Sequence, residues 1–309
     1  MILIDETFKG NFEQGTYVAL GSFDGIHKGH LTLMNKVISI SKEKKALSMV
    51  YTFKNHPMTV VNNTIAPKLL INNKKKQEII ENLGIDILCL ETFDKKMMLL
   101  EPEDFIKELI ERFNVRGLVV GFNYRFGHKN KGDLAMLEKL KKKYNFELYV
   151  MKAYQEESDV VSSSRIRRLI KDGELEMANE LLGREFVLNG KIVDGKKLGR
   201  TIGFPTANLE VNEDMIIPEK AVYYTNVEYN GKIYKGITSV GNNPTVNGQN
   251  TTIETYILDF SEDIYGKSIK LYFLEKMREQ VKFNSLDELK AQLEKDKQFA
   301  IERKIKINL

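Results

Sequence analysis

The segment Gly21–His30 concentrates side chains that can bind a polyphosphate. It contains three glycines, one lysine and two of the four histidines of the chain. Glycine lets backbone N–H groups approach a ligand closely, and the start of a helix favours an anion. His27 and His30 are three residues apart, so they are neighbours on a helix. The segment therefore indicates an anion-binding turn. A turn with two surface histidines is the simpler alternative, and a His-x-x-His metal site lacks an obvious third ligand.

The segment Ser162–Arg167 has a second set of groups suited to phosphate. Hydroxyls and exposed backbone amides at the start of a helix, followed by an arginine one turn later, form an anion site. The alternative is an ordinary capped helix with basic surface residues, and the motif alone does not decide between the two. Its position after the last predicted strand of the first domain favours the functional interpretation.

The segment Gly199–Asn208 is a candidate for binding metal and phosphate. Gly199 and Gly203 permit tight loops. Thr206 and Asn208 are two residues apart, so in an extended stretch they face the same side. A hydroxyl and an amide carbonyl are hard oxygen ligands that suit a Mg²⁺ shared with phosphates. The chemistry alone, however, favours a Gly/Pro turn that leads into a strand.

The first half of the chain must position the first two segments, and its apolar pattern alternates between strand and helix. Strands are predicted at 16–20, 47–53, 85–90, 117–122 and 147–152, and helices at 30–41, 74–83, 102–113 and 133–144. This alternation predicts a mostly parallel sheet with helices on its faces. Ligands of such sheets bind beyond the carboxyl ends of the strands, which is where Gly21–His30 is expected.

The pattern changes after Ser164. Two short helices are predicted at 165–171 and 175–182, and a strand-rich region begins at Phe186. Its strands are predicted at 222–229, 232–240, 253–260 and 268–273, with an Asn230-Gly231 hairpin turn between the first two. A capping box at Ser285–Glu288 begins a final helix that runs to about Ile305. We therefore expect an α/β domain at residues 1–183 and, at 184–309, a small antiparallel barrel or sandwich with a C-terminal helix.

Composition excludes several classes of protein. The 309 residues are 42% hydrophobic and 29% charged, which is typical of about two globular domains and excludes a disordered chain. A net charge of +4 is too small to indicate a nucleic-acid partner. The single cysteine, Cys89, excludes a disulfide framework and is expected in the core. Neither a membrane span nor a signal peptide is apparent, so a cytoplasmic location is expected.

Four motifs of the first domain resemble those of the bacterial bifunctional riboflavin kinase/FAD synthetases. Gly21–His30 resembles their G-x-F-D-G-x-H-x-G-H segment, a form of the H-x-G-H signature of nucleotidyltransferases. The other three are Thr52–Pro57 (T-F-x-P-H-P, with Asn55 for Pro), Gly121–Gly127 (G-x-[DN]-F-x-F-G, with Tyr124 for Phe) and Val161–Arg167 ([IV]-S-S-T-x-x-R, with Ser164 for Thr).

This resemblance implies a Rossmann-like nucleotidyltransferase fold that adenylylates FMN with ATP and releases pyrophosphate. A phosphate monoester is already ionised, so catalysis should rest on positioning and charge neutralisation. The resemblance implies catalytic roles for His27, His30 and Arg167. ATP would be bound by Gly21, Phe23, Asp24, Gly25, Lys28, Gly29, Ser163 and Ser164, and the flavin by Asn123, Arg125 and Phe126.

The second half of the chain resembles riboflavin kinases. Gly199–Asn208 matches their G-R-x-x-G-F-P-T-A-N signature, and further likenesses are Ser239–Thr245, Ile253–Phe260, Asp263–Lys267 and Arg278–Phe283. Gln280 replaces the usual acid of the last motif, and Ala221 replaces an expected glycine. The resemblance covers about residues 15–305 and implies a six-stranded antiparallel barrel as the second domain.

For this domain the resemblance implies transfer of the γ-phosphate of ATP to riboflavin. Glu254 would be the base that takes the proton of the 5′-hydroxyl, whereas an isolated acid in a strand would simply face solvent. Phosphates would be bound by Gly199, Arg200 and Gly203, the flavin by Asn243 and Arg278, and Mg²⁺ by Thr206 and Asn208.

Two other classes of protein share some of these features. One is a cytidylyl- or pantetheine-phosphate adenylyltransferase with an unrelated β domain, against which Gly199–Asn208 argues. The other is a non-enzymatic nucleic-acid module, which needs a basic, aromatic stripe on the barrel. Tyr223, Tyr224, Tyr229 and Tyr234 instead alternate like ordinary barrel positions. The expected partners are ATP, riboflavin and FMN, with no nucleic acid and no membrane. The oligomeric state stays open, as does retention of both activities.

Overall fold

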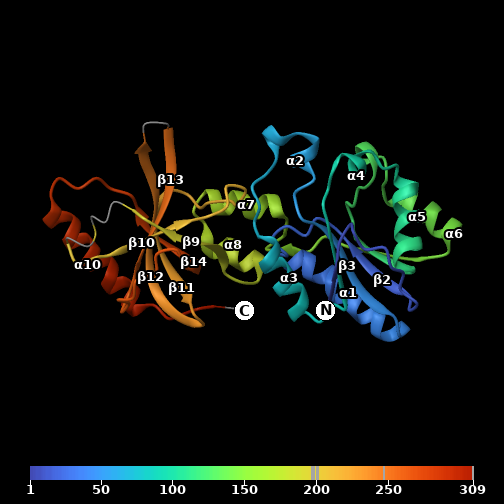
Figure 1. Cartoon of the computed structure of the whole chain (residues 1–309), viewed down its shortest axis with the longest axis horizontal. Helices are drawn as coiled ribbons and strands as arrows, with labels where there is room; N and C mark the ends of the chain where they lie inside the picture. Colours follow the sequence, from blue (N-terminus) through green and yellow to red (C-terminus); the bar gives the residue numbers. More distant parts are fainter. Residues whose placement is uncertain (196–198, 200–201, 246–247, 308–309) are drawn as a thin grey trace. The chain divides into compact units, whose positions relative to one another are not determined.

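The computed structural model describes residues 1–195, 199, 202–245 and 248–307. Contacts divide the chain into two compact units, Met1–Ser163 and Ser164–Leu309 (Figure 1). Each unit has its own sheet: six parallel strands in the first and a closed six-stranded barrel in the second. The predicted architecture, an α/β domain followed by a six-stranded antiparallel barrel with a C-terminal helix, is confirmed.

In the sheet of the first unit, the second strand along the chain lies between two pairs of strands that follow it in the sequence. The strands are β1 (Ile2–Ile4), β2 (Thr16–Leu20), β3 (Leu47–Phe53), β4 (Ile87–Glu91), β5 (Val115–Gly121) and β6 (Glu147–Met151), in the order β1-β4-β3-β2-β5-β6. All neighbours are parallel. The chain moves to one side from β2 to β3 and β4, then returns to the other side for β5. The order therefore reverses between β2 and β5, the place where such sheets bind ligands.

Helices cover both faces of this sheet because successive strand residues point to opposite sides. In β2, Tyr17 and Ala19 pack with α1 (Lys28–Lys44) and α3 (Asn73–Asn82). Val18 and Leu20 pack instead with α5 (Pro102–Phe113) and α6 (Leu134–Tyr144). Cys89 is buried in the second of these cores, as predicted.

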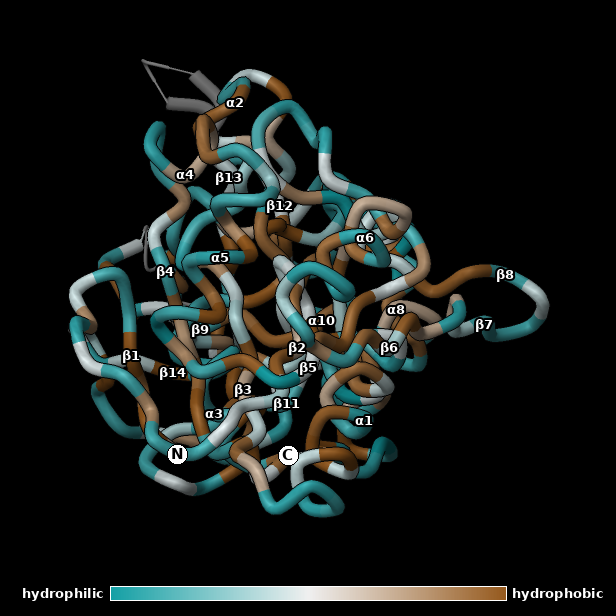
Figure 2. The backbone as a smooth tube through the Cα atoms, turned by 90° about the vertical axis from the view of Figure 1, so that its right-hand side faces the viewer, coloured by the Kyte–Doolittle hydropathy of each residue, from teal (hydrophilic) through white to brown (hydrophobic). Residues whose placement is uncertain are grey.

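Shorter elements lie in the connections of the first unit. They are α2 (Met58–Val61), η1 (Asn63–Ile65), α4 (Lys95–Leu99), η2 (His128–Asn130) and a hairpin of β7 (Gln155–Glu156) and β8 (Asp159–Val160). Figure 2 shows this hairpin projecting away from the parallel strands. Neither the hairpin nor edge strand β1 was predicted, because two- and three-residue strands carry no periodic pattern.

The second unit begins with two helices, α7 (Ser163–Lys171) and α8 (Leu175–Leu182), and continues into the barrel. The strands are β9 (Phe186–Val193), β10 (Thr206–Glu210), β11 (Ala221–Tyr229), β12 (Lys232–Thr245), β13 (Gly248–Ile257) and β14 (Ser268–Glu279). They close in the order β10-β13-β12-β11-β14-β9. Helix α10 (Leu286–Glu302) covers part of the outer surface, where Ala300 and Phe299 pack on Val222 and Tyr224.

The barrel interior contains a row of threonines. Thr238 hydrogen-bonds through its hydroxyl to Thr225 at 2.8 Å and to Thr255 at 2.9 Å, and all three residues are fully buried. Because alternate residues of a strand face opposite sides, Ser239 and Glu254 point outward. Asn230 and Gly231 have φ values of 49° and 74° between β11 and β12, so the predicted hairpin turn is confirmed.

The contact-based division precedes the predicted boundary at 183/184. Helix α8 is tied to the barrel: the Asn179 side chain donates to the Phe273 carbonyl at 2.8 Å and accepts from the Phe186 amide at 2.7 Å. The Glu219 amide also donates to the carbonyl of Ile170 in α7. By contacts, α7 and α8 thus belong with the second unit. Where the two functional domains meet stays a prediction.

Candidate active sites

The turn after β2 is held in an unusual conformation. Phe23 and Ile26 have φ values of 43° and 40°, a left-handed conformation that is an outlier for a β-branched side chain such as that of Ile26. Phe23, Asp24, Ile26 and His27 are all buried. Strained backbone of this kind persists only where its surroundings enforce it, and it clusters at functional sites. Gly21, Gly25 and Gly29 lie in the same segment, at the carboxyl end of β2.

The two histidines of this segment lie against each other. His27 caps α1, and its Nδ1 accepts a hydrogen bond from the His30 amide at 3.3 Å. The imidazole rings stack with centroids 3.6 Å apart, and the Phe23 ring packs edge-on against His30 at 5.2 Å. The predicted neighbour relation is therefore present. It places two imidazole rings at a helix N-terminus, where an anion is favoured.

The turn is also bonded to the start of the serine motif. The Ser163 hydroxyl donates to the backbone carbonyl of Asp24 at 2.9 Å. This bond joins two residues of the first unit that lie 139 positions apart in the sequence. Ser164 and Arg167 lie on α7, where Ser164 is exposed and Arg167 is half-buried.

Lys28 forms an ion pair with the hairpin. Its Nζ lies 3.0 Å from Glu156 Oε1 in β7, and this hydrogen bond lowers the pKa of the Glu156 carboxyl. The sequence motif gave no sign of this partner, because β7 is only two residues long. A carboxylate on Lys28 competes with any phosphate that would bind the same ammonium.

We expect Glu156→Gln to lower the KM for ATP in FAD formation. The amide keeps the shape of the side chain and removes the competing charge. Because solvent screens a partly exposed ion pair, the decrease should be at most about 5-fold. Steady-state rates with varied ATP and saturating FMN measure it, and Glu157→Gln at the exposed hairpin tip is the matched control. Equal KM values in the two variants would contradict the competition.

The predicted flavin-binding turn follows β5, next to β2 in the sheet. Asn123 is exposed, and the exposed Arg125 pairs with Asp133 at 3.2 Å. Phe126 differs from the expectation: its ring is 6% exposed and packs with Phe105 in the core, so it is not offered to a ligand. Phe122, which the motif did not single out, is 46% exposed at the end of the same strand.

The barrel register brings the predicted base beside a predicted metal ligand. Asn208 of β10 and Ser239 of β12 are the direct partners of Glu254 in β13. Direct partners in an antiparallel pair have Cβ atoms about 4.5–5.5 Å apart on one face. Thr206 lies on the same outward face, opposite Tyr256. Three oxygen-bearing side chains of β10 and β13 therefore share one patch outside the barrel.

Two glycines fit closely around this patch. A Cβ on Gly195 would lie 2.0 Å from Asn208 Nδ2, and a Cβ on Gly199 would lie 2.1 Å from the carbonyl oxygen of Phe204. Any other residue would displace these groups. Gly203 adopts a φ of 86° in the same loop. Arg200 and the side chain of Asn243 lie outside the part of the chain that the structure describes.

Arg278 continues the same outward row but is held by another residue. Val222 of β11 pairs with both Ser239 and Arg278. The Arg278 guanidinium donates to the buried Asp296 of α10, with Nε–Oδ1 at 3.0 Å and Nη2–Oδ2 at 2.6 Å. Gln280, which departs from the acid of the expected motif, donates from Nε2 to Ser239 Oγ at 2.9 Å.

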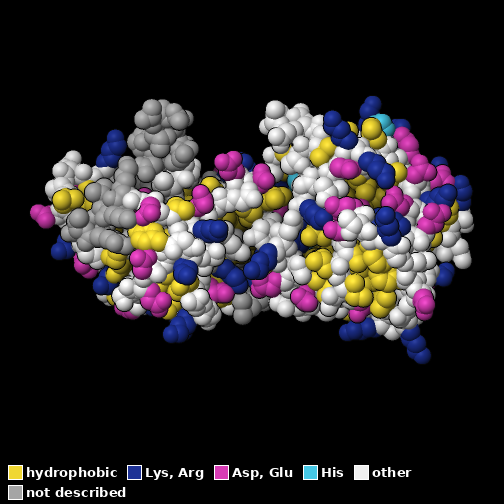
Figure 3. All heavy atoms as spheres, in the orientation of Figure 1, with side chains coloured by type: hydrophobic (Ala, Val, Ile, Leu, Met, Phe, Trp, Pro, Cys, Tyr) yellow, Lys and Arg dark blue, Asp and Glu magenta, His cyan; other side chains and the backbone are white. Residues whose placement is uncertain are grey.

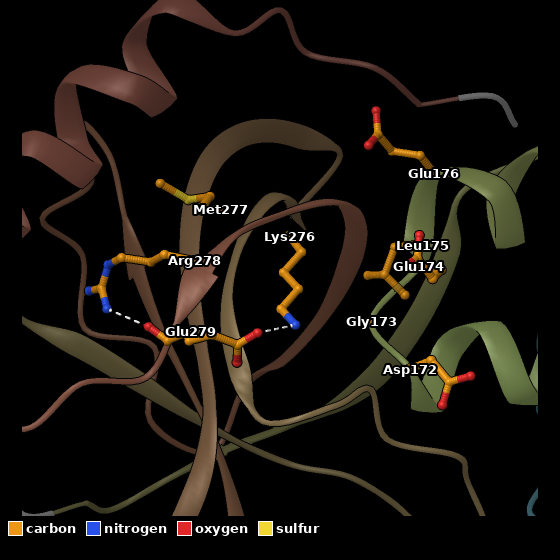
Figure 4. A pocket seen from close by; sticks show the side chains of 9 residues that line it. All are labelled: Asp172, Gly173, Glu174, Leu175, Glu176, Lys276, Met277, Arg278 and Glu279. Atoms are coloured by element: carbon orange, nitrogen blue, oxygen red, sulfur yellow. Dashed lines mark hydrogen bonds and ion pairs between the residues drawn. The ribbon is translucent and has the colours of Figure 1, made fainter.

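A polar cavity of about 480 Å³ lies at the other end of this row (Figure 4). Lys276 and Glu279 form an ion pair inside it. Arg278 is the predicted site residue that contributes to its wall, whereas Glu254, Thr206 and Asn208 do not line it. The cavity is therefore not the predicted kinase site. Its lining is Asp172, Gly173, Glu174, Leu175, Glu176, Lys276, Met277, Arg278 and Glu279.

Two family models match the chain in tandem. Residues 9–165 match FAD synthetase and residues 182–303 match riboflavin kinase. A bifunctional riboflavin kinase/FMN adenylyltransferase from Listeria monocytogenes is 39% identical over 91% of this chain and 90% of its own. The chain belongs to this family. Enzymes of the same name from Bacillus subtilis and Escherichia coli are 37% and 33% identical, each over 92% of this chain and 91% of their own.

Membership of the bifunctional riboflavin kinase/FMN adenylyltransferases confirms the predicted pair of activities and their order along the chain. The two family matches leave residues 166–181 between them, which are most of α7 and α8. The departures at Gln280 and Ala221 lie within the kinase match.

One solved structure has the same fold over its whole length. A crystal structure described as a macrolide-efflux protein from Streptococcus pneumoniae has a TM-score of 0.89 and 31% identity, covering 98% of this chain and 100% of that one. That description applies to that protein. Within the ranges that the structure describes, none of the helices combines the length and apolar character needed to cross a membrane.

Proposed function

We propose that the chain makes FMN from riboflavin on the barrel and FAD from FMN at the carboxyl edge of the parallel sheet, with ATP as donor in both steps. The observation that carries this proposal is the pairing of Glu254 with Asn208, together with the stacked His27 and His30 at the start of α1. Each step has its own cluster of suitable groups, so neither needs the other's residues.

In adenylyl transfer, a phosphate oxygen of FMN attacks the α-phosphorus of ATP and pyrophosphate leaves. The attacking oxygen is already an anion, so the protein's task is to hold two anions together. His27 and His30, with the amides at the start of α1, would receive the phosphates and stabilise the charge that develops. Lys28 would join them on leaving Glu156. Ser163, Ser164 and Arg167 would bind the departing pyrophosphate, and Asn123 and Arg125 the flavin.

In the kinase step, the neutral 5′-hydroxyl of riboflavin must lose its proton as it attacks the γ-phosphorus of ATP. Glu254 is a carboxylate on a strand that is paired on both sides, so its position is rigid. It would take the proton while ADP leaves. The phosphate-binding loop would be formed by Gly199, Arg200 and Gly203. The flavin would be contacted by Asn243 and Arg278. Asp296 would orient the Arg278 guanidinium through their hydrogen bonds.

Thr206 and Asn208 suit Mg²⁺. A hydroxyl, an amide oxygen and the neighbouring carboxylate of Glu254 are the oxygen donors that this cation prefers. The Asn208 side chain also packs closely against the backbone at Gly195, which restricts where its amide can lie. When bound with ATP, the cation supplies charge neutralisation at the phosphates. The cytoplasmic location expected from the sequence stays a prediction.

The test is product chromatography after riboflavin, ATP and Mg²⁺ are added to the purified chain. We expect FMN to appear first and FAD second, with pyrophosphate released in the second step. FMN supplied directly should give FAD without riboflavin, and chelation of Mg²⁺ should stop both reactions. If riboflavin gives neither product and supplied FMN is not adenylylated, the proposal fails.

Figure 3 shows basic and acidic side chains intermixed on the visible face of the first unit, as suits a small-molecule enzyme.

A further inference from the structure

Lys76 is a buried lysine to which neither proposed reaction assigns a role. It lies in the first turn of α3 and is only 5% exposed. An ammonium group removed from water is costly unless it is hydrogen-bonded. Its Nζ donates to two backbone carbonyls, that of Phe53 at 3.0 Å and that of Ser22 at 3.3 Å.

Both carbonyls lie at the carboxyl edge of the parallel sheet. Phe53 is the last residue of β3, and Ser22 belongs to the turn that follows its neighbour β2. The Ser22 carbonyl also accepts from the Thr52 hydroxyl at 2.8 Å. The first residues of the turn Gly21–His30 are therefore fastened to the end of β3 by two donors, one from the strand and one from α3.

The charge of Lys76 lies beneath this turn. Asp24, whose carboxylate accepts from the Leu70 amide at 3.0 Å, is the charged group that acts on it. Burial lowers the pKa of Lys76 to about 8, and Asp24 opposes that effect. At pH 7 the amine is therefore mostly protonated, and it places a positive charge behind the segment that receives ATP.

The neighbouring Lys75 has a different arrangement. It is also buried, at 4% exposed, but its Nζ pairs with Glu78 of the same helix at 2.9 Å. Its hydrogen bonds thus stay within α3. Lys75 and Lys76 form a natural pair for comparison, because they share burial, helix and side-chain type and differ in whether the amine reaches the turn.

We propose that Lys76 is a positioning residue of adenylyl transfer, which fastens the turn Gly21–His30 to β3 and holds a buried positive charge beneath it. This inference rests on the proposed adenylyl transfer in the first unit. A fixed charge needs no reorganisation as two anions are brought together. Misplacing reacting groups by about 1 Å can lower the rate about 10²-fold, so a residue that fixes the position of the turn can have a large effect on catalysis.

The first experiment measures FAD formation from supplied FMN in Lys76→Met, Lys76→Arg and Lys75→Met, with FMN formation from riboflavin as internal control. We expect Lys76→Met to lower kcat about 10- to 100-fold while KM for ATP changes by less than about 3-fold. Lys75→Met should alter kcat by less than about 3-fold, and FMN formation should stay near the parent rate in every variant. Near-parent kcat in Lys76→Met, or an equal loss in Lys75→Met, overturns the inference.

The second experiment compares the pH profile of FAD formation in the parent, between pH 7 and 9.5, with the profiles of Lys76→Met and Lys76→Arg. A lysine with lowered pKa loses its charge as pH rises through about 8, so kcat/KM for FAD formation should fall there. Lys76→Met has no group to lose its proton, and Lys76→Arg stays charged. Both should lack the inflection, and Lys76→Arg should recover part of the lost rate.

Other groups around Lys76 do not account for such an inflection. On α3 the facing pair is Lys75–Glu78, and beyond β3 Lys54 pairs with Asp5 and Glu6, which raises the pKa of Lys54. The phosphate of FMN titrates near pH 6, below the window. A flat parent profile, or an inflection that persists in Lys76→Met, overturns the inference. Absence of any FAD from the parent would instead refute the proposed function.

Discussion

Replacing Glu254 by glutamine should reduce FMN formation by about 10²- to 10⁴-fold, the usual contribution of a proton transfer. Glutamine keeps the size of the side chain and its place between Asn208 and Ser239, but it cannot accept the proton of the riboflavin hydroxyl. FAD formation from supplied FMN should continue at the parent rate, because that nucleophile is already an anion. Initial rates of both half-reactions in one preparation measure the effect.

The control for this substitution is Glu262→Gln, an exposed acid just beyond the same strand. It should leave both rates unchanged. Affinity for riboflavin, measured by the change in flavin fluorescence, should change little in Glu254→Gln, since an isosteric replacement on the barrel's outer face leaves the packing intact. A glutamine variant that phosphorylates riboflavin at near the parent rate would show that another group takes the proton.

The second large effect is expected from His30→Ala, which should lower FAD formation by about 10²- to 10³-fold. Loss of one donor that stabilises developing charge typically has this cost. His30 also keeps the His27 ring in place through the stack at 3.6 Å, so the substitution affects both imidazoles. FMN formation on the barrel should persist, because its proposed site lies in the other unit.

His128→Ala is the matched control for His30→Ala. His128 lies in η2 and pairs with Glu101, outside the turn Gly21–His30. Its loss should leave FAD formation within about 3-fold of the parent. If His30→Ala abolished both activities in a chain that still shows the parent circular-dichroism spectrum, the model of two separate sites would be wrong.

Elements with strong local signals were predictable to the residue. The apolar run of β3 at Leu47–Phe53 and the proline-initiated α5 at Pro102–Phe113 have the predicted bounds. Helix α5 ends where Asn114 adopts a φ of 51°, a conformation that asparagine tolerates. In these segments the apolar periodicity and the residues at the ends favour the same structure, so tertiary contacts do not change the local preference.

Strands that depend on distant partners were predicted too short. β12 was expected to end at Val240 because Gly241, Asn242 and Pro244 favour loops, yet it continues to Thr245. Its register runs on beside β13, with Gly241 opposite Thr252. Pairing with β13 stabilises the extended conformation of these residues, although their own preference is for loops. β14 likewise runs to Glu279 through two irregularities in its pairing with β11.

The sites show the same division. Motifs identified the types of residue, but the pairing of Asn208 with Glu254 depends on barrel register, which no local pattern encodes. The Lys28–Glu156 pair depends on a hairpin of two-residue strands. Lys76 lies in a run of three lysines at the start of a helix, a pattern typical of a solvated surface, and only the fold shows that its amine is buried.

The threonine row inside the barrel constrains how this sequence can evolve. The Thr238 hydroxyl bonds to both Thr225 and Thr255. Valine at position 238 would keep the side-chain volume but leave the other two hydroxyls buried without this hydrogen-bond partner. Each buried hydroxyl left without a hydrogen bond lowers the stability of the fold by about 1–3 kcal/mol. Exchanging all three threonines for apolar residues of the same shape can be nearly neutral. Single mutational steps between the two states therefore pass through a less stable barrel. The three positions should drift together or not at all, so that a lineage keeps whichever interior, hydroxylated or apolar, it first acquired.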